Sequence, residues 1–383
     1  MNAKRMIGPT KILLVGQTPP PFGGQAVMIE KTLKGSYGDR VELHHVRMAF
    51  SKRMDQIGKV KLAKIGELFR VLSGIVVGRL KHRANVLYYF PAGPSVVAVL
   101  RDIALLLPTR WMFRKTIFHF RASGLSEYYL TLPALLRPLF RMVYFEADIG
   151  IRLSESAPED AKILKAKREY IVPNGIEDVY AEYLTVCERA TENLKREALH
   201  ITYIGVLSEG KGIKILLEAC AILAREGISF LANLVGEFES ENFENYVRRF
   251  CAEHRLEEEL IFRGVLTGCE KYRVLATSDI FCFPSFFESE TTPVAVLEAL
   301  CFGLPVVSTR WRGIPSIVED EVEGFLVPIR DADAVAQKLQ LLMRDPDLRN
   351  EMARRGRKRY LERFTIDIYY RNMQRVFEAA AKV

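Results

Sequence analysis

Short apolar runs bounded by turn residues alternate with helix-period stretches along the whole chain, and this alternation most constrains the fold. The first run, residues 11–16 (KILLVG), is followed by a Pro/Gly loop at 18–24 and a helical pattern from Gln25 to Leu33. We expect further strands in the first half at residues 40–46, 85–90, 116–120, 149–153 and 169–172. Strands that alternate with helices pair in parallel, so the pattern predicts an α/β fold with a doubly wound sheet.

The same cycle restarts in the second half. Residues 178–200 are polar and helix-prone, and a new strand begins at Ile201, with others expected at 230–236, 260–264, 280–284 and 305–309. A chain of 383 residues suits two domains of roughly 150–200 residues each. We therefore expect two Rossmann-like domains, at 1–185 and 200–365, with a linker at 186–199. An amphipathic C-terminal helix at 366–383 is expected to pack back on the N-terminal domain.

The net charge of +8 is unevenly distributed between the two halves. Residues 1–199 contain 31 Lys and Arg against 19 Asp and Glu, a net +12, whereas residues 200–383 contain 24 against 28, a net −4. A one-sided positive field attracts nucleic acid, anionic lipid or a phosphorylated acceptor, or it is a merely solvated surface. The sequence contains no recognised nucleic-acid-binding motif, so we expect no nucleic-acid partner.

The cysteines and the N-terminus indicate the compartment. Six cysteines lie between residues 187 and 301 without a CxxC pair, which is typical of reduced, buried thiols. The apolar stretch from Ile12 to Val15 is too short for a signal peptide, and no apolar run reaches the ~20 residues that span a bilayer. These observations predict a cytoplasmic protein without a transmembrane helix.

The segment 280–309 (IFCFPSFFESETTPVAVLEALCFGLPVVST) carries the most chemical information. A buried strand ends near Pro284, and a helix is expected from Pro293 to near Gly303. Glu290 precedes this helix, and Glu298, eight positions later (298 − 290 = 8), lies inside it. The N–H groups of Thr291, Thr292 and Val294 are then at the positive helix end, where anionic ligands bind in open α/β sheets. Carboxylates there can accept hydrogen bonds from sugar hydroxyls, although such glutamates are often only caps or surface charges.

This segment resembles the donor site of family 4 glycosyltransferases, which have the GT-B fold of two facing Rossmann-like domains. The family pattern PS-x-x-E-x7-E-A, followed by Gly-x-Pro-Val-Val, is matched, apart from two extra residues between Ser285 and Glu290, by the following residues: Pro284, Ser285, Glu290, Glu298, Ala299, Gly303, Pro305, Val306 and Val307. The chain has Thr291 and Thr292 where the family often has Gly and Phe.

The resemblance extends to other segments of the second half. In residues 203–219 it implies that Gly205 lets the backbone approach the donor diphosphate and that Lys211 neutralises it. Val206 stands where the family usually has an arginine. The resemblance also implies that main-chain groups near Gly264 and Val265 read the base and that Glu298 binds the ribose. Glu237 is either a further polar contact or a solvent-facing loop residue.

In the first half, residues 19–28 (PPPFGGQAVM) look like the family's glycine loop, in which Gly23 and Gly24 approach the donor phosphates and the acceptor. A Gly-Gly pair alone is normally just a turn. Residues 116–124 (TIFHFRASG) end a strand where the family places a histidine facing the reacting sugar. The register leaves His119 and Arg121 as alternatives, and we favour His119.

The resemblance implies a retaining hexosyltransferase that uses a UDP- or GDP-sugar. Glu290, His119 and Lys211 are the expected catalytic residues. The leaving diphosphate helps to remove the acceptor proton, and Lys211 and helix-start N–H groups stabilise the developing charge. We expect no metal and no cofactor besides the donor substrate.

The acceptor is indicated only by basic segments. Residues 57–83, 101–115 and 130–144 mix Lys and Arg with apolar side chains. Such helices lie in a bilayer interface and attract anionic lipid, or they are ordinary core faces with basic edges. We expect a peripheral enzyme on the inner face of the membrane that acts on a lipid-linked saccharide or another polysaccharide precursor.

Two other functions fit the sequence. A nucleotide-sugar epimerase can share the fold, and it converts the donor without an acceptor. A non-catalytic nucleotide-sugar-binding protein would bind the donor without turnover. Val206, Thr291 and Thr292 are mild support for the second alternative.

Overall fold

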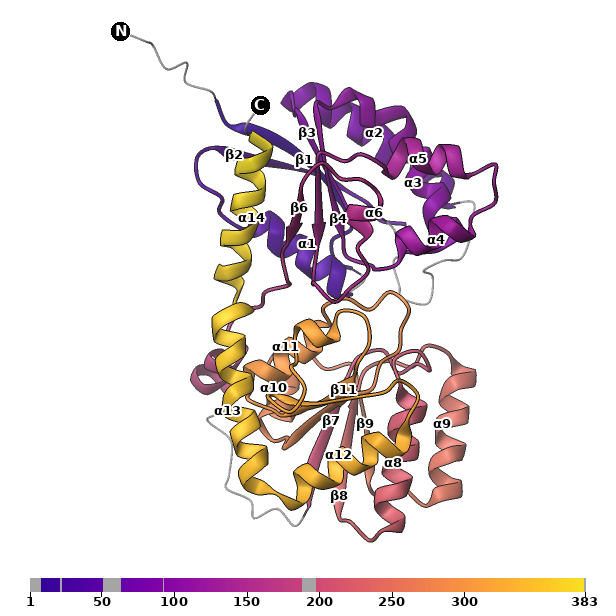
Figure 1. Cartoon of the computed structure of the whole chain (residues 1–383), viewed down its shortest axis with the longest axis vertical. Coiled ribbons are helices and arrows are strands. Elements are labelled where there is room, and N and C mark those ends of the chain that lie inside the picture. The colour runs from indigo at the N-terminus through magenta and orange to yellow at the C-terminus, as the bar shows by residue number, and fades with distance from the viewer. Residues whose placement is uncertain (1–7, 21–22, 51–62, 92, 188–197, 382–383) are drawn as a thin grey trace. The chain divides into compact units, whose positions relative to one another are not determined.

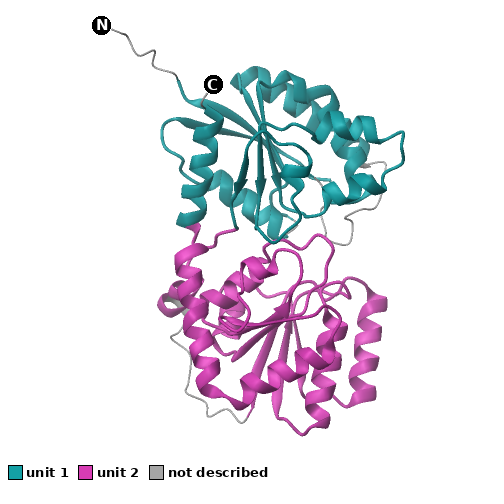
Figure 2. Cartoon of the chain, in the orientation of Figure 1, with its two compact units in different colours: residues 1–173, 367–383 teal, residues 174–366 magenta. Residues whose placement is uncertain are grey.

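A computed structural model of the chain describes residues 8–20, 23–50, 63–91, 93–187 and 198–381 (Figure 1). The chain divides into two compact units (Figure 2). Unit 1 contains residues 1–173 and 367–383, and unit 2 contains residues 174–366. The division between residues 173 and 174 precedes the expected linker at 186–199, of which residues 188–197 lie outside the described part.

Unit 1 contains one parallel six-stranded sheet with the order β2-β1-β3-β4-β5-β6. Its strands are β1 (Thr10–Gly16), β2 (Val41–Arg47), β3 (Val86–Tyr89), β4 (Lys115–Phe120), β5 (Ile149–Arg152) and β6 (Glu169–Ile171). The strand order reverses direction between β1 and β3, which is the switch point of this sheet. The six expected strands of the first half are confirmed to within two residues at each end.

The helices of unit 1 connect successive strands. They are α1 (Gly24–Lys34), α2 (Ala63–His82), α3 (Val96–Thr109), η2 (Arg110–Met112), α4 (Leu125–Thr131), α5 (Arg137–Tyr144) and α6 (Asp160–Ile163). Parallel strands need such crossover connections, which explains the alternation in the sequence.

The last helix, α14 (Ile366–Ala381), belongs to unit 1 from Asp367 onward. Its buried side chains recur at helical spacing: Tyr369, Met373, Val376, Phe377 and Ala380. The Tyr369 hydroxyl lies 2.5 Å from Thr32 Oγ1 of α1 and accepts a 2.9 Å hydrogen bond from Arg121 Nη2. The expected packing of the C-terminal helix on the N-terminal domain is therefore confirmed.

Unit 2 has a second parallel six-stranded sheet, with the order β12-β11-β10-β7-β8-β9. Its strands are β7 (Leu199–Ile204), β8 (Phe230–Val235), β9 (Leu260–Gly264), β10 (Ile280–Phe283), β11 (Val306–Thr309) and β12 (Gly324–Val327). This is the Rossmann order, and its switch point lies between β7 and β10. Five of these strands were expected. The four-residue β12 was not, because it follows a polar turn without a longer apolar run.

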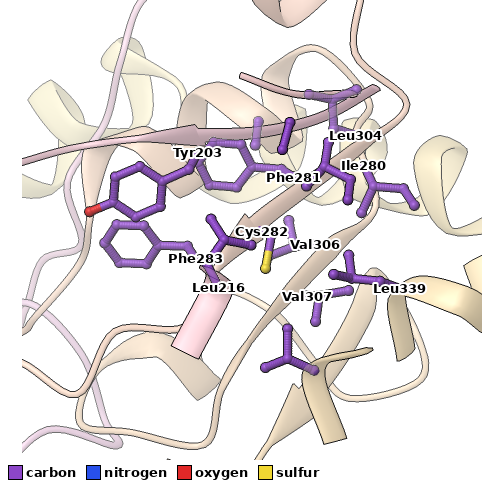
Figure 3. Close-up of a cluster of buried hydrophobic side chains, with 14 of the residues drawn as sticks. Tyr203, Leu216, Ile280, Phe281, Cys282, Phe283, Leu304, Val306, Val307 and Leu339 are labelled. Carbon is purple, nitrogen blue, oxygen red and sulfur yellow. The ribbon is translucent and has the colours of Figure 1, made fainter. Parts of the chain in front are cut away.

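The helices of unit 2 are α7 (Val179–Glu182), η3 (Tyr183–Cys187), α8 (Ile213–Arg225), α9 (Glu241–His254), α10 (Gly268–Ala276), α11 (Val294–Cys301), η5 (Ile314–Ser316), α12 (Ala332–Arg344) and α13 (Pro346–Arg363). Strands β10 and β11 are entirely buried, and Tyr203, Phe281 and Val306 are among the side chains that pack in this core (Figure 3). Strands covered on both faces read as continuous apolar runs, as they do here.

Four of the cysteines, Cys220, Cys251, Cys282 and Cys301, are free and buried. Burial raises the pKa of the Cys220 and Cys282 thiols, which keeps them protonated and unreactive. Cys269 is disulfide-bonded, so the expectation of six reduced thiols is wrong at this position.

Candidate functional site

The loops that follow β7 and β10 meet at the switch point of the unit 2 sheet. In open α/β sheets, ligands bind beyond the carboxyl ends of the strands at such a point. The first loop runs from Gly205 to Gly212, and the second from Pro284 to Pro293. The Phe286 N–H donates a 2.9 Å hydrogen bond to the Gly210 carbonyl, which fastens the two loops together.

Lys211 and Glu290 form an ion pair across these loops. Lys211 Nζ donates a 2.7 Å hydrogen bond to Glu290 Oε2, and the Ser285 hydroxyl donates a second, also of 2.7 Å, to the same oxygen. The Glu290 carboxylate is buried and the lysine side chain is about one-fifth exposed. The pair therefore places a positive and a negative charge side by side at the carboxyl ends of β7 and β10.

Gly212 allows the loop after β7 to approach the end of β10. Its φ is +82°, and a methyl group at this position would lie 2.0 Å from the Pro284 carbonyl oxygen. Any other residue would be both strained and in collision with the neighbouring backbone. Gly212 is also the residue before α8, so this contact fixes where Lys211 and the start of α8 lie.

Aromatic side chains surround the Lys211 ammonium. Lys211 Nζ lies 4.7 Å from the ring centroid of Phe287 and 5.6 Å from that of Phe283. Phe283 stacks on Tyr203, with 5.6 Å between the ring centroids. Burial, and to a smaller extent the Glu290 charge, raises the pKa of Tyr203 well above its ordinary value, so its hydroxyl stays protonated. It donates a 2.9 Å hydrogen bond to the Val206 carbonyl.

The helix α11 begins at Val294, immediately after Pro293, and its N-terminus lies in the second loop. Its first N–H groups have no partner within the helix and carry partial positive charge. Thr291 and Thr292 precede it and are both buried. Asn174 Nδ2 donates a 2.9 Å hydrogen bond to the Thr292 carbonyl, which helps to position the residues before this helix.

Glu298 lies in α11 and forms a second ion pair of the same kind. Lys271 of α10 donates a 2.6 Å hydrogen bond from Nζ to Glu298 Oε1. The glutamate side chain is about one-tenth exposed and the lysine about one-fifth. Residues 284–301 therefore contribute the glutamates of two lysine–glutamate pairs. Glu290 lies before α11 and Glu298 lies within it.

Three glycines mark the carboxyl ends of β7, β8 and β9: Gly205, Gly236 and Gly264. The Gly205 N–H donates to the Val235 carbonyl, and the Gly236 N–H donates to the Gly264 carbonyl. A methyl group on Gly236 would lie 1.8 Å from the Gly205 carbonyl oxygen, so the backbones meet without side chains between them. Glu237 and Val265 follow on exposed loop positions.

In unit 1, Gly23 and Gly24 lie at the start of α1, which follows β1 at that sheet's switch point. Gly23 has φ of −109° and ψ of 154°, a conformation that any residue adopts. The glycines therefore leave the N-terminus of an eleven-residue helix without covering side chains.

His119 and Arg121 both point to the side of the unit 1 sheet that α14 covers. His119 is fully buried in β4, and its Nδ1 lies 2.7 Å from the Tyr88 hydroxyl. Its Nε2 has no hydrogen-bond partner among the described residues. Burial, and next the Arg121 charge, lower the pKa of His119 well below its ordinary value, so the ring is neutral. Arg121 follows β4 and donates to Tyr369, as described above.

Comparisons with known proteins decide the family. The sequence model of the family described as "Glycosyl transferases group 1" matches residues 188–359. The amylovoran biosynthesis glycosyltransferase AmsK of Erwinia amylovora is 30% identical over 304 residues, which cover 73% of this chain and 74% of AmsK. The chain belongs to the group 1 glycosyl transferases. WcaL of Escherichia coli K12, named for colanic acid biosynthesis, is 27% identical over 295 residues, which cover 70% of this chain and 71% of WcaL.

Solved structures agree with the fold of this glycosyltransferase. Sucrose-phosphate synthase from Thermosynechococcus elongatus superimposes with a TM-score of 0.73 at 17% identity and covers 97% of this chain and 99% of its own. Anabaena HepE, solved in complex with UDP-glucose, gives a TM-score of 0.69 at 17% identity and covers 96% of this chain and 99% of its own. The chain is thus a glycosyltransferase of the GT-B fold, with two Rossmann-like domains.

Within unit 2 of the glycosyltransferase, the structure brings together Lys211, Glu290, Thr291 and Thr292, with Glu298 further along α11. Sequence reasoning missed the groups that hold these residues, namely Ser285 as a donor to Glu290, Lys271, Phe287 and Asn174. Ser285 stood in the quoted motif, directly after the strand, and its proximity to Glu290 was readable. Lys271 and Asn174 had no local signal, because their partners are 27 and 118 positions away.

Proposed function

We propose that this enzyme is a retaining hexosyltransferase that moves a sugar from a UDP- or GDP-sugar to a lipid-linked saccharide or another polysaccharide precursor. The observation that carries the proposal is the Lys211–Glu290 pair at the carboxyl ends of β7 and β10, beside the N-terminus of α11. A largely buried cation, helix-end N–H groups and a carboxylate are complementary to a diphosphate that carries a hydroxyl-rich sugar.

The donor diphosphate binds Lys211 and the N–H groups that begin α11, with Thr291 and Thr292 beside it. Glu290 accepts hydrogen bonds from the sugar hydroxyls and orients the ring. We also propose that Gly23 and Gly24, at the start of α1, contact the donor phosphates and the acceptor, because neither residue adds a side chain at the N-terminus of this helix.

The nucleoside occupies the glycine-lined end of the sheet. Gly205, Gly236 and Gly264 end three adjacent strands, and nothing lies within 4 Å of the position that a Cβ on Gly264 would take, so a flat base can approach the backbone there. The main chain at Val265 reads the base, and Glu237 adds a polar contact from the neighbouring loop. Glu298, held by Lys271, accepts from the ribose hydroxyls.

In the transfer, the bond between the anomeric carbon and the diphosphate oxygen breaks, and a bond from the acceptor oxygen forms on the same face. The acceptor proton passes to the leaving phosphate oxygen. Lys211 and the α11 N–H groups stabilise the charge that develops on the diphosphate, and this removes the need for a metal ion. Glu290 holds the sugar while its anomeric carbon becomes positive.

We assign the unit 1 contact to the sugar to His119 rather than Arg121. The unpartnered Nε2 supports this assignment, because a buried polar atom without a hydrogen bond is uncommon outside functional sites. The alternative, Arg121, donates a hydrogen bond from Nη2 to Tyr369 of α14.

The acceptor class is inferred from the names of the relatives and from the basic first half. AmsK and WcaL are named for amylovoran and colanic acid biosynthesis, and both products are polysaccharides. Precursors of such polymers are often carried on lipids. We place the enzyme in the cytoplasm, peripherally on the inner face of the membrane, where its net +12 over residues 1–199 meets anionic lipid.

The test is turnover with defined donors. The protein is incubated with UDP- and GDP-sugars, with and without lipid-linked acceptors, and the anomeric configuration of the product is determined by NMR. Transfer with retention, dependent on an acceptor, is the expected result. Conversion of the donor sugar without an acceptor would identify an epimerase. Donor binding without turnover over varied acceptors would identify a binding protein.

A further inference from the structure

Three neighbouring elements of unit 1 expose apolar side chains where a helix of a water-soluble domain normally carries polar ones. On α2 these are Ile65, Phe69, Val77 and Leu80, which recur at helical spacing on the solvent side. Phe69 and Leu80 are each 66% exposed. The buried residues of the same helix, such as Val71 and Ile75, face the sheet, so α2 is apolar on both sides.

The adjacent helix α3 repeats this arrangement and continues into η2. Val96, Leu100 and Leu107 are exposed at helical spacing, and Trp111 of η2 follows with 78% of its surface exposed. A third apolar group lies at α5 and the loop before it, where Leu135 is 90% exposed. Isolated exposed apolar residues are ordinary, but two adjacent helices with exposed apolar side chains at helical spacing, beside a further exposed leucine, are not.

The three sets lie on neighbouring elements. Helix α2 packs against α3, and α3 packs against α5 (Figure 1). Arg79 of α2 donates a 2.9 Å hydrogen bond to the Met112 carbonyl of η2. Arg110 of η2 donates a 2.8 Å bond to the Val143 carbonyl of α5. These two arginines bracket Trp111 and connect the end of α2, through η2, to the end of α5. We call the exposed side of α2, α3, η2 and α5 the apolar face.

The segment that contains the apolar face has an excess of positive charge. Residues 63–145 contain 12 Lys and Arg against 3 Asp and Glu, a net +9. Of the three acids, Asp102 is fully buried and Glu67 is bound by Arg70. Lys81 and Arg141 are exposed beside the apolar side chains. Two copies of the chain that met through this face would bring like charges together, so a second copy is disfavoured.

We infer that the apolar face is the surface by which the enzyme docks on an anionic bilayer. An apolar helix surface with Trp, Phe and Leu at its tips and Lys and Arg at its edge is the arrangement that inserts into the headgroup region. None of the described helices is long and apolar enough to cross a membrane, so the docking is interfacial. The inference rests on the membrane location proposed above and assigns it to named side chains.

The test is vesicle binding by the full chain. Sedimentation with vesicles of phosphatidylcholine alone is compared with vesicles that also contain phosphatidylglycerol. We expect binding to the anionic vesicles that weakens with salt. The double variant Trp111→Ser, Leu135→Ser is expected to bind at least about tenfold more weakly. The matched control Leu341→Ser, Leu361→Ser changes two exposed leucines of unit 2 and is expected to bind within about twofold of the parent.

A direct readout comes from Trp111 itself. In a Trp311→Phe background Trp111 is the remaining tryptophan, since the chain has two, and its emission should shift to the blue and be quenched by brominated lipid. Equal binding by the Trp111→Ser, Leu135→Ser variant would overturn the inference. So would a dimer, seen by analytical ultracentrifugation, that these substitutions abolish, because that result would assign the face to a second copy.

Binding of UDP and GDP by calorimetry is measured on the same variants. The apolar face is separate from the Lys211–Glu290 pair, so nucleotide binding is expected to stay unchanged. If a variant loses vesicle binding but still binds the nucleotide, the result supports the docking surface. If vesicles are bound but the nucleotide is not, only the proposed donor site is contradicted.

Discussion

Lys211 Nζ and Glu290 Oε2 lie 2.7 Å apart although the two residues are 79 positions apart in the sequence. The pair joins the loops after β7 and β10, which are adjacent in the sheet, so the topology creates the contact. Before a donor arrives, the ammonium and the carboxylate neutralise each other in a largely buried place. We propose that a donor diphosphate shares this ammonium with Glu290, so substitutions at Lys211 and at Glu290 test diphosphate binding and turnover separately.

Replacing the carboxylate tests its role in turnover. In Glu290→Gln the side chain keeps its size but loses the charge that orients the sugar. We expect kcat to fall by about 100-fold or more, with the dissociation constant of the donor within a few-fold of the parent value. Steady-state kinetics and calorimetry measure the two quantities. Glu288→Gln, an exposed change two residues earlier, is the control, and an equal loss in both variants would remove Glu290 from the mechanism.

Removing the cation tests diphosphate binding. Lys211→Ala is expected to weaken binding of the nucleoside diphosphate by about tenfold to 100-fold, because a charge-assisted contact is lost and Glu290 then repels the phosphates. The salt dependence of binding should decrease at the same time. Lys214→Ala removes a lysine of the same helix region that pairs with Glu209, and its affinity should match the parent. Unchanged affinity in Lys211→Ala would contradict the assignment.

The Lys271–Glu298 pair predicts recognition of the ribose. We expect the parent enzyme to bind the ribonucleoside diphosphate, UDP or GDP, roughly tenfold more tightly than its 2′-deoxy form. In Glu298→Gln this preference should shrink to about twofold, since the charged acceptor is gone. Titration calorimetry of the two nucleotides with both proteins gives the comparison. If Glu298→Gln keeps the full preference for the ribonucleotide, the ribose binds elsewhere. The control is Glu241→Gln, an exposed change on α9, which should keep the preference of the parent enzyme.

Alanine substitutions at Gly212 and Gly227 separate the energetic cost of backbone strain from that of a steric collision. Gly227 and Gly212 both have positive φ, +69° and +82°, but a methyl group on Gly227 meets nothing within 4 Å. Gly227→Ala is expected to lower the free energy of unfolding by about 1–2 kcal/mol from strain alone. Gly212→Ala should lower it by about 3 kcal/mol or more, because its methyl group also collides with Pro284. Denaturant unfolding of both variants checks the difference, and equal losses would mean that the loop relaxes.

Because His119 is buried and neutral, we expect the free energy of unfolding to decrease at acid pH. Burial lowers its pKa in the folded protein well below the 6.5 of the unfolded chain. Below about pH 6.5 the unfolded chain therefore binds a proton that the folded protein does not, and stability falls by up to about 1.4 kcal/mol per pH unit. His119→Asn should reduce that slope, whereas His254→Asn, on the exposed side of α9, should not. Urea unfolding at about pH 7 and about pH 5.5 measures it.

The same variant tests the contact to the sugar. If His119 Nε2 touches the donor sugar, His119→Asn lowers kcat at about pH 7 at a temperature where the variant remains folded. A purely structural histidine would change the midpoint of unfolding without changing kcat. The two measurements on one protein therefore decide between the roles.

Much of the architecture was predictable because it is encoded locally. The runs KILLVG and IFCF are apolar throughout, as buried parallel strands must be, and the helical patterns between them set the crossovers. The string from Pro284 to Val307 likewise contains its strand, loop and helix in one stretch. Residues such as Lys211 and Glu290 could therefore be singled out without knowing how they meet.

The rest depends on contacts that distant segments make. Nothing near Lys271 indicates that it pairs with Glu298, because α10 and α11 come together only after the sheet has formed. Tyr369 contacts Thr32 although the two residues are 337 positions apart, and no periodicity in the sequence indicates this contact. The sequence showed that the segment of α2 mixes basic and apolar side chains. Which of the apolar side chains are exposed depends on the side of the helix that the sheet covers.

The membership of α14 in unit 1 has a consequence for biosynthesis. The first unit takes its final helix from the last residues of the chain, whereas the second unit is continuous from 174 to 366. Unit 2 can therefore complete its core from one continuous segment, whereas unit 1 keeps Thr32, Tyr88 and Arg121 uncovered until α14 packs against them. Folding of unit 1 thus depends on a segment that leaves the ribosome after all of unit 2.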